Sequence, residues 1–502
     1  MISKKVLQNI LSNWTGFFIN IAIAFIVSPI FVSELGNEVY GIWVLIVSIT
    51  GFFNVLDFGI NTAVVRYISK YLASKKYDQI TAVISSALFV FLGLSLIGFI
   101  IILYFGWNFK ELFDIPAFSQ KYLFYVFLLV GLDLAINICF GVFQGALQGL
   151  QKFIHINFIL ISVNILKNIM LVYLLIEGYS LLALALVQLL FTIVRYVLYI
   201  LILLKDCPVK TFTFKAISKP TLKKLFNYSI YSLIIAIAGK VIFYSDSVVI
   251  AANLTTADVT LFAIPSMITI YLEQFVWAMI AVLVPVISGM DAKGEQGENK
   301  QIYLYGTLYV QLICMPVFFV LALFGRDFLG LWMGDDFTTV SGDILLVLLS
   351  GFYFLLSQLI SQGILKGISK HAFVAYVLIA EAVANLAISL ILVQYYGVLG
   401  VAIGTVLPTL VVNVFLLPGY TCRVLGLKYF PYLLKSTIYP AVFLGITILF
   451  GWQLSLSVDN YSQLFFVSLS SLVLFYTISF FLFVNKLHRS QVFDYVKRVL
   501  AS

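Results

Sequence analysis

The sequence predicts an all-α integral membrane protein with about fourteen transmembrane helices, arranged as two parallel six-helix lobes followed by two further helices. Three observations lead to this prediction: a strongly apolar composition, a series of apolar runs of membrane-spanning length, and an internal repeat of about 219 residues. The first two exclude a soluble chain, and the third sets the order of the helices.

The composition leaves no place in water for the apolar residues. Of the 502 residues, 62% are hydrophobic and only 10% are charged. A soluble protein carries roughly 25% charged and 45–50% apolar residues, and a single soluble core stops growing near about 250–300 residues. The composition therefore excludes an ordinary soluble enzyme and a disordered chain. It also argues against a peripheral protein with one anchor, because the apolar excess runs along the whole length.

A transmembrane helix needs about 20 mostly apolar residues. Fourteen such runs lie near residues 10–32, 40–63, 82–105, 122–148, 153–176, 180–204, 226–252, 258–288, 302–324, 342–365, 372–394, 398–420, 437–454 and 462–484. The second and fourth are interrupted by polar residues, so twelve or thirteen spans remain open. The first run is too long for a signal peptide and lacks a small-residue cleavage site, so we expect it to be retained.

The distribution of charge predicts the orientation. With the N-terminus in the cytoplasm, 24 of the 30 Lys and Arg residues fall in inner segments, three in outer segments and three within spans. The positive-inside rule therefore predicts a cytoplasmic N-terminus, and an even number of spans places the C-terminus there too. The net charge of +8 thus reflects membrane topology, and we expect no nucleic-acid partner.

The four cysteines, at positions 139, 207, 314 and 422, lie in spans or inner segments, so no disulfide is expected.

An internal repeat divides the chain. A Gln-Gly-x-Leu-x-Gly-x-x-Lys motif occurs at residues 144–152 and again at 362–370, an offset of 218 residues, and Gly178 and Gly397 correspond at an offset of 219. The offset spans six helices, so the two copies are parallel, a design typical of transporters. The predicted domains are an N-terminal lobe (1–204), a cytoplasmic lobe linker (205–225), a C-terminal lobe (226–420), helices 13 and 14 with the preceding cytoplasmic loop (421–484), and a cytoplasmic tail (485–502).

Several motifs carry a resemblance to a known family. They are Pro29-x-Phe31-x-x-x-Leu35-Gly36-x-x-x-Tyr40-Gly41-x-Trp43, Leu56-Asp57-Phe58-Gly59-x-x-x-Ala63-x-x-Arg66-Tyr67, the Gln144-Gly145 segment, the Asp246 region, and Phe324-Gly325 through Trp332-Met333-Gly334. In these motifs the chain resembles bacterial polysaccharide (O-antigen type) flippases. Their superfamily also holds multidrug-and-toxin exporters and peptidoglycan-precursor flippases. The motifs are loose and mostly structural, so they indicate the family better than the substrate.

The resemblance implies a fold and a function. The implied MATE-like fold is two six-helix bundles in a V, often with two extra helices. The implied activity is the movement of polyprenyl-pyrophosphate-linked polysaccharide repeat units from the cytoplasmic to the outer leaflet by alternating access. The implied partners are this lipid-linked glycan, membrane lipids and polysaccharide assembly proteins, in a bacterial or archaeal plasma membrane.

Other functions stay open beside this one. They are a multidrug or cation-coupled exporter of the same fold, a peptidoglycan-precursor flippase, and a membrane-embedded polysaccharide polymerase or ligase. A polymerase or ligase usually carries a large outer loop, whereas the longest outer segments are only residues 106–121 and 325–341. The three His residues form no nucleophile or metal set, and no Gly-x-x-x-x-Gly-Lys-Ser/Thr loop is present. We therefore expect no enzymatic activity, no cofactor and no metal site.

Ionisable residues within spans are costly and mark functional sites by default. The eight in this chain are Asp57, Asp133, Lys167, Arg195, Lys240, Asp246, Glu273 and Glu381. Asn, Gln, Ser and Thr at helical spacing also form polar stripes on at least seven spans. Such stripes either line a hydrated cavity or form hydrogen bonds between helices, and their number favours the cavity.

Three buried cations are candidates for binding an anionic substrate. Because a pyrophosphate carries roughly two negative charges, it needs cations where water is scarce. We expect Lys167, Arg195 and Lys240, with Asn164 and Gln188, to bind the pyrophosphate or glycan. The alternatives are structural ion pairs for the two lysines and snorkelling to the inner interface for Arg195.

The acids within the spans suggest coupling to an ion gradient. Asp133, Asp246, Glu273 and Glu381 are candidates for binding a proton or sodium ion. The equally open alternative is that they balance the charges of the three cations. Asp57 lies in a family motif and is interpreted as structural.

Overall fold

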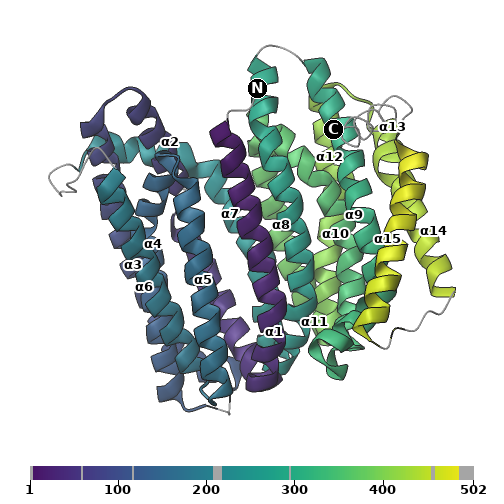
Figure 1. The fold of residues 1–502 in the computed structure, drawn as a ribbon, viewed down its shortest axis with the longest axis horizontal. Coiled ribbons are helices and arrows are strands. Elements are labelled where there is room, and N and C mark those ends of the chain that lie inside the picture. Colours follow the sequence, from purple (N-terminus) through teal and green to yellow (C-terminus); the bar gives the residue numbers. More distant parts are fainter. Residues whose placement is uncertain are drawn as a thin grey trace. The chain divides into compact units, whose positions relative to one another are not determined.

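The structure of the chain, a computed structural model, describes residues 4–57, 60–115, 118–206, 217–292, 296–453, 458 and 460–484. Every regular element in these ranges is a helix, so the predicted all-α class is confirmed (Figure 1). The chain forms two compact units, Met1–Thr260 and Leu261–Ser502, which we call unit 1 and unit 2. Residues 207–216 of the predicted linker, including Cys207, and the predicted tail 485–502 lie outside the described residues. The predicted lobe boundaries stay a prediction.

Unit 1 is built around α4. Its elements are α1 (Lys4–Phe53), the 3-10 turn η1 (Asn54–Asp57), α2 (Ile60–Ala73), α3 (Tyr77–Phe113), α4 (Gln120–Gly149), α5 (Phe153–Ile176), α6 (Leu181–Asp206), α7 (Lys219–Asn253) and the first residues of α8 (Thr256–Ala292). α4 packs against α2, α3 and α6, while α5 packs against α1 and α6. α7 contacts α1, α2 and α3.

Unit 2 holds the remainder of α8 and the C-terminal elements. These are α9 (Gln296–Met333), the 3-10 turn η3 (Asp335–Phe337), α10 (Val340–Gly367), α11 (His371–Val411), the π-helical η4 (Val412–Leu416), α12 (Leu417–Leu425), α13 (Tyr429–Leu433), the π-helical η5 (Leu434–Ile438), α14 (Tyr439–Gln453) and α15 (Tyr461–Phe483). α10 contacts α9 and α11, and α14 and α15 pack on α9. Tyr432 of α13 stacks on Tyr303 of α9, with ring centroids 4.6 Å apart. The two additional C-terminal helices are therefore part of the packing of unit 2.

Breaks at two glycines account for the number of spans. Twelve helices of the described chain are long and apolar enough to cross a membrane. Two of these contain a glycine with positive φ, Gly36 in α1 (φ 75°) and Gly397 in α11 (φ 57°). A straight helix of the 50 residues of α1 would be about 75 Å long, more than twice a hydrocarbon core of about 30 Å. Counting the two halves of each broken helix separately gives fourteen crossings, as the sequence predicts.

Hydrogen bonds within α11 show that the chain turns back at Gly397. Asn385 Nδ2 donates to Thr405 Oγ1 at 2.9 Å, and Thr409 Oγ1 donates to Glu381 Oε1 at 2.8 Å. The partners lie farther apart in sequence as their distance from Gly397 grows, which is the pattern of two antiparallel helices. A residue other than glycine would be strained at this turn because L side chains rarely adopt a positive φ.

The internal repeat is visible in the packing of both units. Ser69 Oγ donates to the carbonyl of Gly149 at 2.9 Å, and Ser288 Oγ donates to the carbonyl of Gly367 at 2.9 Å. The serines are 219 residues apart and the glycines 218. Residues 151 and 369, also 218 apart, both adopt a positive φ. The contact between α2 and α4 in unit 1 is therefore repeated between α8 and α10 in unit 2.

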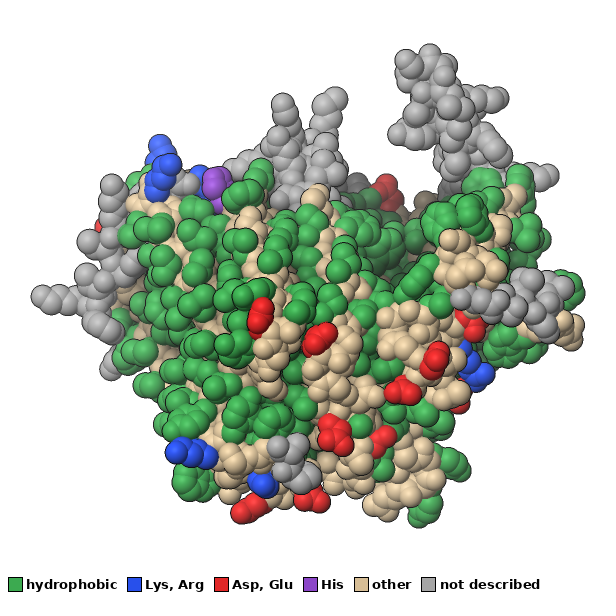
Figure 2. All heavy atoms as spheres, turned by 60° about the horizontal axis from the view of Figure 1, so that its bottom comes forward, with side chains coloured by type: hydrophobic (Ala, Val, Ile, Leu, Met, Phe, Trp, Pro, Cys, Tyr) green, Lys and Arg blue, Asp and Glu red, His purple; other side chains and the backbone are tan. Residues whose placement is uncertain are grey.

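The surface suits a lipid environment. Figure 2 shows a face covered largely by hydrophobic side chains. Exposed acids lie at the ends of α3 and α5 and in η3, on the side that the charge distribution predicts to be outer: Glu111, Asp114, Glu177, Asp335 and Asp336. Large apolar side chains that would be unfavourable in water are stable in contact with lipid.

A close approach between the two halves of α11 gives a stability prediction. Gly404 lies so near Ser389 that an added Cβ would stand 2.7 Å from the Ser389 Cα. We expect Gly404→Ala to lower the free energy of unfolding by about 1–3 kcal/mol, measured by thermal unfolding in detergent, because one half of the hairpin must shift. The matched control is Gly419→Ala in α12, where a Cβ would meet no atom within 4 Å. Equal melting temperatures for the two variants would contradict the described packing.

Candidate functional site

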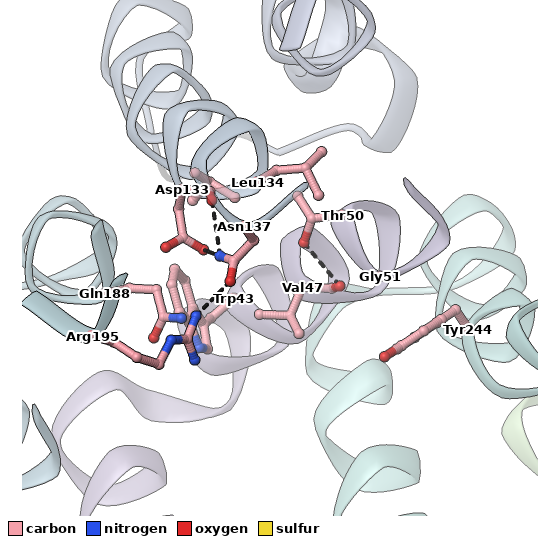
Figure 3. Close-up of a pocket in the computed structure, with 11 residues that line it drawn as sticks. Trp43, Val47, Thr50, Gly51, Asp133, Leu134, Asn137, Gln188, Arg195 and Tyr244 are labelled. Atoms are coloured by element: carbon pink, nitrogen blue, oxygen red, sulfur yellow. Dashed lines mark hydrogen bonds between the residues drawn. The ribbon is translucent and has the colours of Figure 1, made fainter. Parts of the chain in front are cut away.

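Three helices of unit 1 direct polar side chains toward one another. Asp133 and Asn137 are four residues apart and therefore share one face of α4. Gln188 and Arg195 share a face of α6, and Lys167 comes from the middle of α5. The sequence predicted the three stripes separately, and the structure brings them together. Figure 3 shows the residues of α4 and α6 that face each other.

A chain of hydrogen bonds joins the acid to the arginine. Asn137 Nδ2 donates to Asp133 Oδ2 at 3.1 Å and to the Asp133 carbonyl at 2.8 Å. The Arg195 guanidinium donates to Asn137 Oδ1, and the Tyr196 hydroxyl donates to the Asn137 carbonyl at 3.2 Å. Thr192 of α6 also hydrogen-bonds the Asp133 side chain. Asn137 thus fixes the positions of a carboxylate and a guanidinium that face each other from two helices.

Lys167 completes the cluster. Its Nζ donates to Gln188 Oε1 at 3.0 Å. It lies close enough to Asp133 and Arg195 for their charges to interact with its own. Two cations and one carboxylate leave this cluster with one excess positive charge when all three are ionised. Such a cluster can accept an anion without creating an uncompensated buried charge.

The cluster borders a cavity of about 370 Å³. The cavity is lined by Trp43, Val47, Thr50, Gly51, Val130, Asp133, Leu134, Asn137, Gln188, Arg195 and Tyr244. Figure 3 shows Asp133, Asn137, Gln188 and Arg195 grouped on one side, and the Tyr244 hydroxyl pointing from α7 toward the space between. Unit 1 therefore contains a cavity partly lined by the polar stripes of α4 and α6.

Some lining residues were not among the predicted site residues. Trp43 lies in the first family motif and Asn137 lies in the polar stripe of α4, so both carried a signal in the sequence. Tyr244 carried none, because it is one of 29 tyrosines in the chain and nothing in its spacing marks it.

Lys167 and the remaining predicted residues of unit 1 lie around the cavity rather than in its lining. Lys240 is one turn from Tyr244 on α7, with its Nζ 5.0 Å from the centroid of the Tyr244 ring. Asn164 Nδ2 donates to Asn20 Oδ1 and so joins α5 to α1. Asp246 is buried in α7, with 4% of its surface exposed, and is not one of the lining residues.

The two remaining acids come together in unit 2. Glu381 of α11 is buried, and its Oε1 accepts the hydrogen bond from Thr409. Glu273 of α8 is hydrogen-bonded by Trp277 and lies close enough to Glu381 for the two carboxylates to repel each other. Lys366 Nζ lies 4.5 Å from the centroid of the Trp277 ring. In the part of the chain that the structure describes, no group of three or more His, Cys, Asp or Glu side chains is placed to hold a metal.

The polar stripes of unit 2 form hydrogen bonds between helices. Ser361 Oγ donates to Gln358 Oε1 at 2.7 Å and to the Tyr303 hydroxyl at 2.9 Å. Gln358 Nε2 donates to the Tyr432 hydroxyl at 3.0 Å. These four side chains are buried. The alternative interpretation of the stripes, as contacts between helices, therefore applies here, whereas the cavity interpretation applies to α4 and α6.

Comparison with known proteins identifies the family. The sequence profile of the family described as polysaccharide biosynthesis protein matches residues 6–291. The chain is 26% identical over 269 residues to a Haloferax volcanii protein described as a low-salt glycan biosynthesis flippase, a match covering 53% of this chain and just over half, 56%, of that protein. It is 24% identical over 404 residues to a Shigella flexneri protein described as an O-antigen transporter, covering 80% of this chain and 94% of that protein.

Two solved structures share the fold. The lipid II flippase MurJ in its inward closed conformation aligns with a TM-score of 0.71 and 13% identity, over 94% of this chain and 98% of that chain. A multidrug resistance MATE family transporter in its inward-facing conformation aligns with a TM-score of 0.68 and 17% identity, over 85% of this chain and 95% of that chain. The predicted MATE-like class of fold is thus confirmed. The family profile spans more than half of the sequence, and the chain belongs to the polysaccharide biosynthesis protein family.

Proposed function

We propose that this protein moves polyprenyl-pyrophosphate-linked polysaccharide repeat units from the cytoplasmic to the outer leaflet of the plasma membrane by alternating access. Membership of the polysaccharide biosynthesis family and the relatives described as a glycan flippase and an O-antigen transporter support this proposal. The observation that carries it is the cavity in unit 1 together with the cluster of Lys167, Arg195 and Asp133 that borders it and has one excess positive charge.

The chemistry of the cavity suits a pyrophosphate. The head group carries roughly two negative charges and loses its hydration on leaving the membrane surface. Arg195 and Lys167 replace that hydration with charge-assisted hydrogen bonds, and Gln188 and Asn137 add neutral ones. Asp133 holds the two cations in place before the substrate arrives, because two unpaired cations in this interior would repel each other. Lys240 and Asn164 support the site from α7 and α5.

The alternatives of the same fold differ in the charge of their substrates. A multidrug exporter of cationic compounds has no use for a cluster with an excess positive charge at the border of its cavity. A peptidoglycan-precursor flippase would use the same cations, since its substrate is also a lipid-linked pyrophosphate. The lipid-linked glycan that accumulates when the gene is deleted separates the two flippases.

Transport is driven by a proton or sodium gradient through Glu273 and Glu381. Two neighbouring carboxylates in a low-water interior repel each other unless a cation lies between them or one is protonated. The Thr409 hydroxyl supplies a further oxygen beside Glu381. Unit 1 thus binds the anionic substrate, and unit 2 responds to the driving ion.

Both termini lie in the cytoplasm. The imbalance of 24 inner against three outer Lys and Arg residues supports this orientation. The exposed acids at the ends of α3 and α5 and in η3 then face the outside.

The first prediction concerns the two cations. In cells that lack the chromosomal gene, we expect Lys167→Ala and Arg195→Ala to lower glycan export about tenfold or more, because each removes a charge-assisted hydrogen bond to the pyrophosphate. The control is Lys121→Ala, which removes an exposed lysine at the start of α4. Unchanged export at a normal protein level would contradict the role of the cavity. Normal surface glycan with increased drug sensitivity in the deletion strain would favour the exporter.

The second prediction concerns coupling. In reconstituted vesicles, transport should respond to an imposed pH or sodium gradient, and Glu273→Gln and Glu381→Gln should abolish the response because an amide cannot take up a proton or neutralise a cation. Glu111→Gln, at an exposed position of α3, serves as the control. Coupling would be excluded if the unmodified protein were indifferent to both gradients.

The third prediction concerns orientation. In intact cells, a membrane-impermeant maleimide should label Glu177→Cys at the end of α5, and it should label Lys76→Cys only after permeabilisation. Both positions are exposed, and Cys139, Cys314 and Cys422 are buried. The variants are made in a Cys207→Ser background, because Cys207 of the predicted inner linker would otherwise label after permeabilisation. The reverse labelling pattern would place the termini outside.

A further inference from the structure

A second, smaller cavity lies beside the first in unit 1. Its volume is about 170 Å³, and it is lined by Asn61, Phe91, Asn137, Ile138, Gly141, Gln144 and Tyr196. Asn137 lines both cavities, so the two are adjacent. No side chain in the lining of the smaller cavity carries a charge. Its chemistry therefore differs from that of the cationic cavity next to it.

Two amides in this lining have hydrogen-bonding capacity to spare. Asn61 Oδ1 is buried, and no described residue donates a hydrogen bond to it. The Gln144 side chain makes no hydrogen bond with the part of the chain that the structure describes. Asn61 Oδ1 lies against Gly145, where an added Cβ would stand 1.9 Å from it, so the groups available to a ligand are the amide nitrogen of Asn61 and the Gln144 side chain.

The internal repeat shows that this cavity is not required for packing. Asn61 corresponds to Ile280 at an offset of 219, and Gly141 corresponds to Leu359 at an offset of 218. Ile280 and Leu359 are buried in unit 2, with 0% and 1% of their surfaces exposed. The first glycine of the Gln-Gly motif packs against residue 61 in one unit and residue 280 in the other. Unit 2 thus fills with aliphatic side chains the space that unit 1 leaves open and polar.

Filling such a space with apolar side chains normally stabilises a helix bundle, because each buried methyl group adds to its stability. A Cβ at Gly141 would meet no atom within 4 Å, so an alanine fits there without a clash. The absence of a side chain at this position therefore has no steric cause in unit 1. A ligand that occupies the cavity would explain why position 141 is a glycine.

We propose that the smaller cavity binds one neutral sugar ring of the substrate, the ring attached to the pyrophosphate held in the cationic cavity. The volume equals about five or six water molecules of about 30 Å³ each, which suits one pyranose ring. Asn61 and Gln144 bond the hydroxyl or acetamido groups, and Phe91 gives an apolar wall for the ring C–H groups. This inference rests on the proposed function, because it assigns the glycan part of the same substrate.

The test compares two lipids on the purified protein in lipid nanodiscs. One is bare polyprenyl pyrophosphate, and the other carries a single N-acetylglucosamine on the pyrophosphate. We expect the unmodified protein to bind the glycosylated lipid about tenfold more tightly, from two or three neutral hydrogen bonds. Asn61→Ile and Gly141→Leu, which install the residues of unit 2, should bring the ratio close to one and leave the affinity for the bare lipid unchanged.

Matched controls separate a sugar site from a change in folding. Gly93→Leu makes the same substitution at an exposed position of α3 where a Cβ meets no atom within 4 Å, and it should keep the preference. Gln362→Leu in unit 2 should also keep it, whereas Gln144→Leu, its counterpart in unit 1, should weaken it. A loss of preference in both controls would overturn the assignment.

The outcomes also distinguish this inference from the proposed function. If the variants keep the preference of the unmodified protein while Lys167→Ala loses the bare lipid, the sugar site is wrong and the pyrophosphate site stands. If the unmodified protein binds neither lipid, both proposals are wrong. If it binds both lipids equally, the sugar site is wrong.

Discussion

Within a hydrocarbon layer, a helix satisfies its own backbone hydrogen bonds, so its side chains alone decide which neighbour it can approach closely. Lipid is as apolar as leucine, and close packing at small residues takes the place of the hydrophobic effect. In this protein Gly149 lies against Ile68, and Gly367 lies against Ile287 at the repeated position. These contacts hold α2 on α4 and α8 on α10. They therefore set the rotation of α4, the helix whose other residues reach into both cavities of unit 1.

The two copies of the repeat share the contacts that pack their helices, but they differ in the polar and charged residues that face the cavities. The motif glycines occupy corresponding positions in both units, and so do the serines whose hydroxyls donate hydrogen bonds to the glycine carbonyls. Asp133, in contrast, corresponds to Gly351 at an offset of 218, and Gln188 corresponds to Leu407 at an offset of 219. Unit 1 consequently carries a charged cluster beside a cavity, and unit 2 carries a buried acid pair. Packing positions tolerate few residues in either copy, while positions that face a cavity are free to diverge.

Similar polar patterns in the sequence led to different arrangements in the two units. On α4 and α6, Asp133, Asn137 and Gln188 line a cavity. On the two halves of α11, Glu381, Asn385 and Ser389 face the second half and bond to it, where Gly404 allows close approach. The spacing of polar residues fixes the face on which they lie. It does not fix whether a neighbour comes close enough to bond them or stays far enough away to leave room for a ligand.

The sequence by itself determined the helical membrane class, the number of crossings and the repeat, because these follow from run length, composition and motifs along the chain. It also marked Asp133, Lys167 and Arg195, since a charge within a span is costly wherever it lies. Only the tertiary structure decided that these three gather in one cluster, while Asn164 bonds Asn20 and Glu273 meets Glu381. The reason is that each such contact joins two helices, and its length depends on how closely and at what rotation those helices pack.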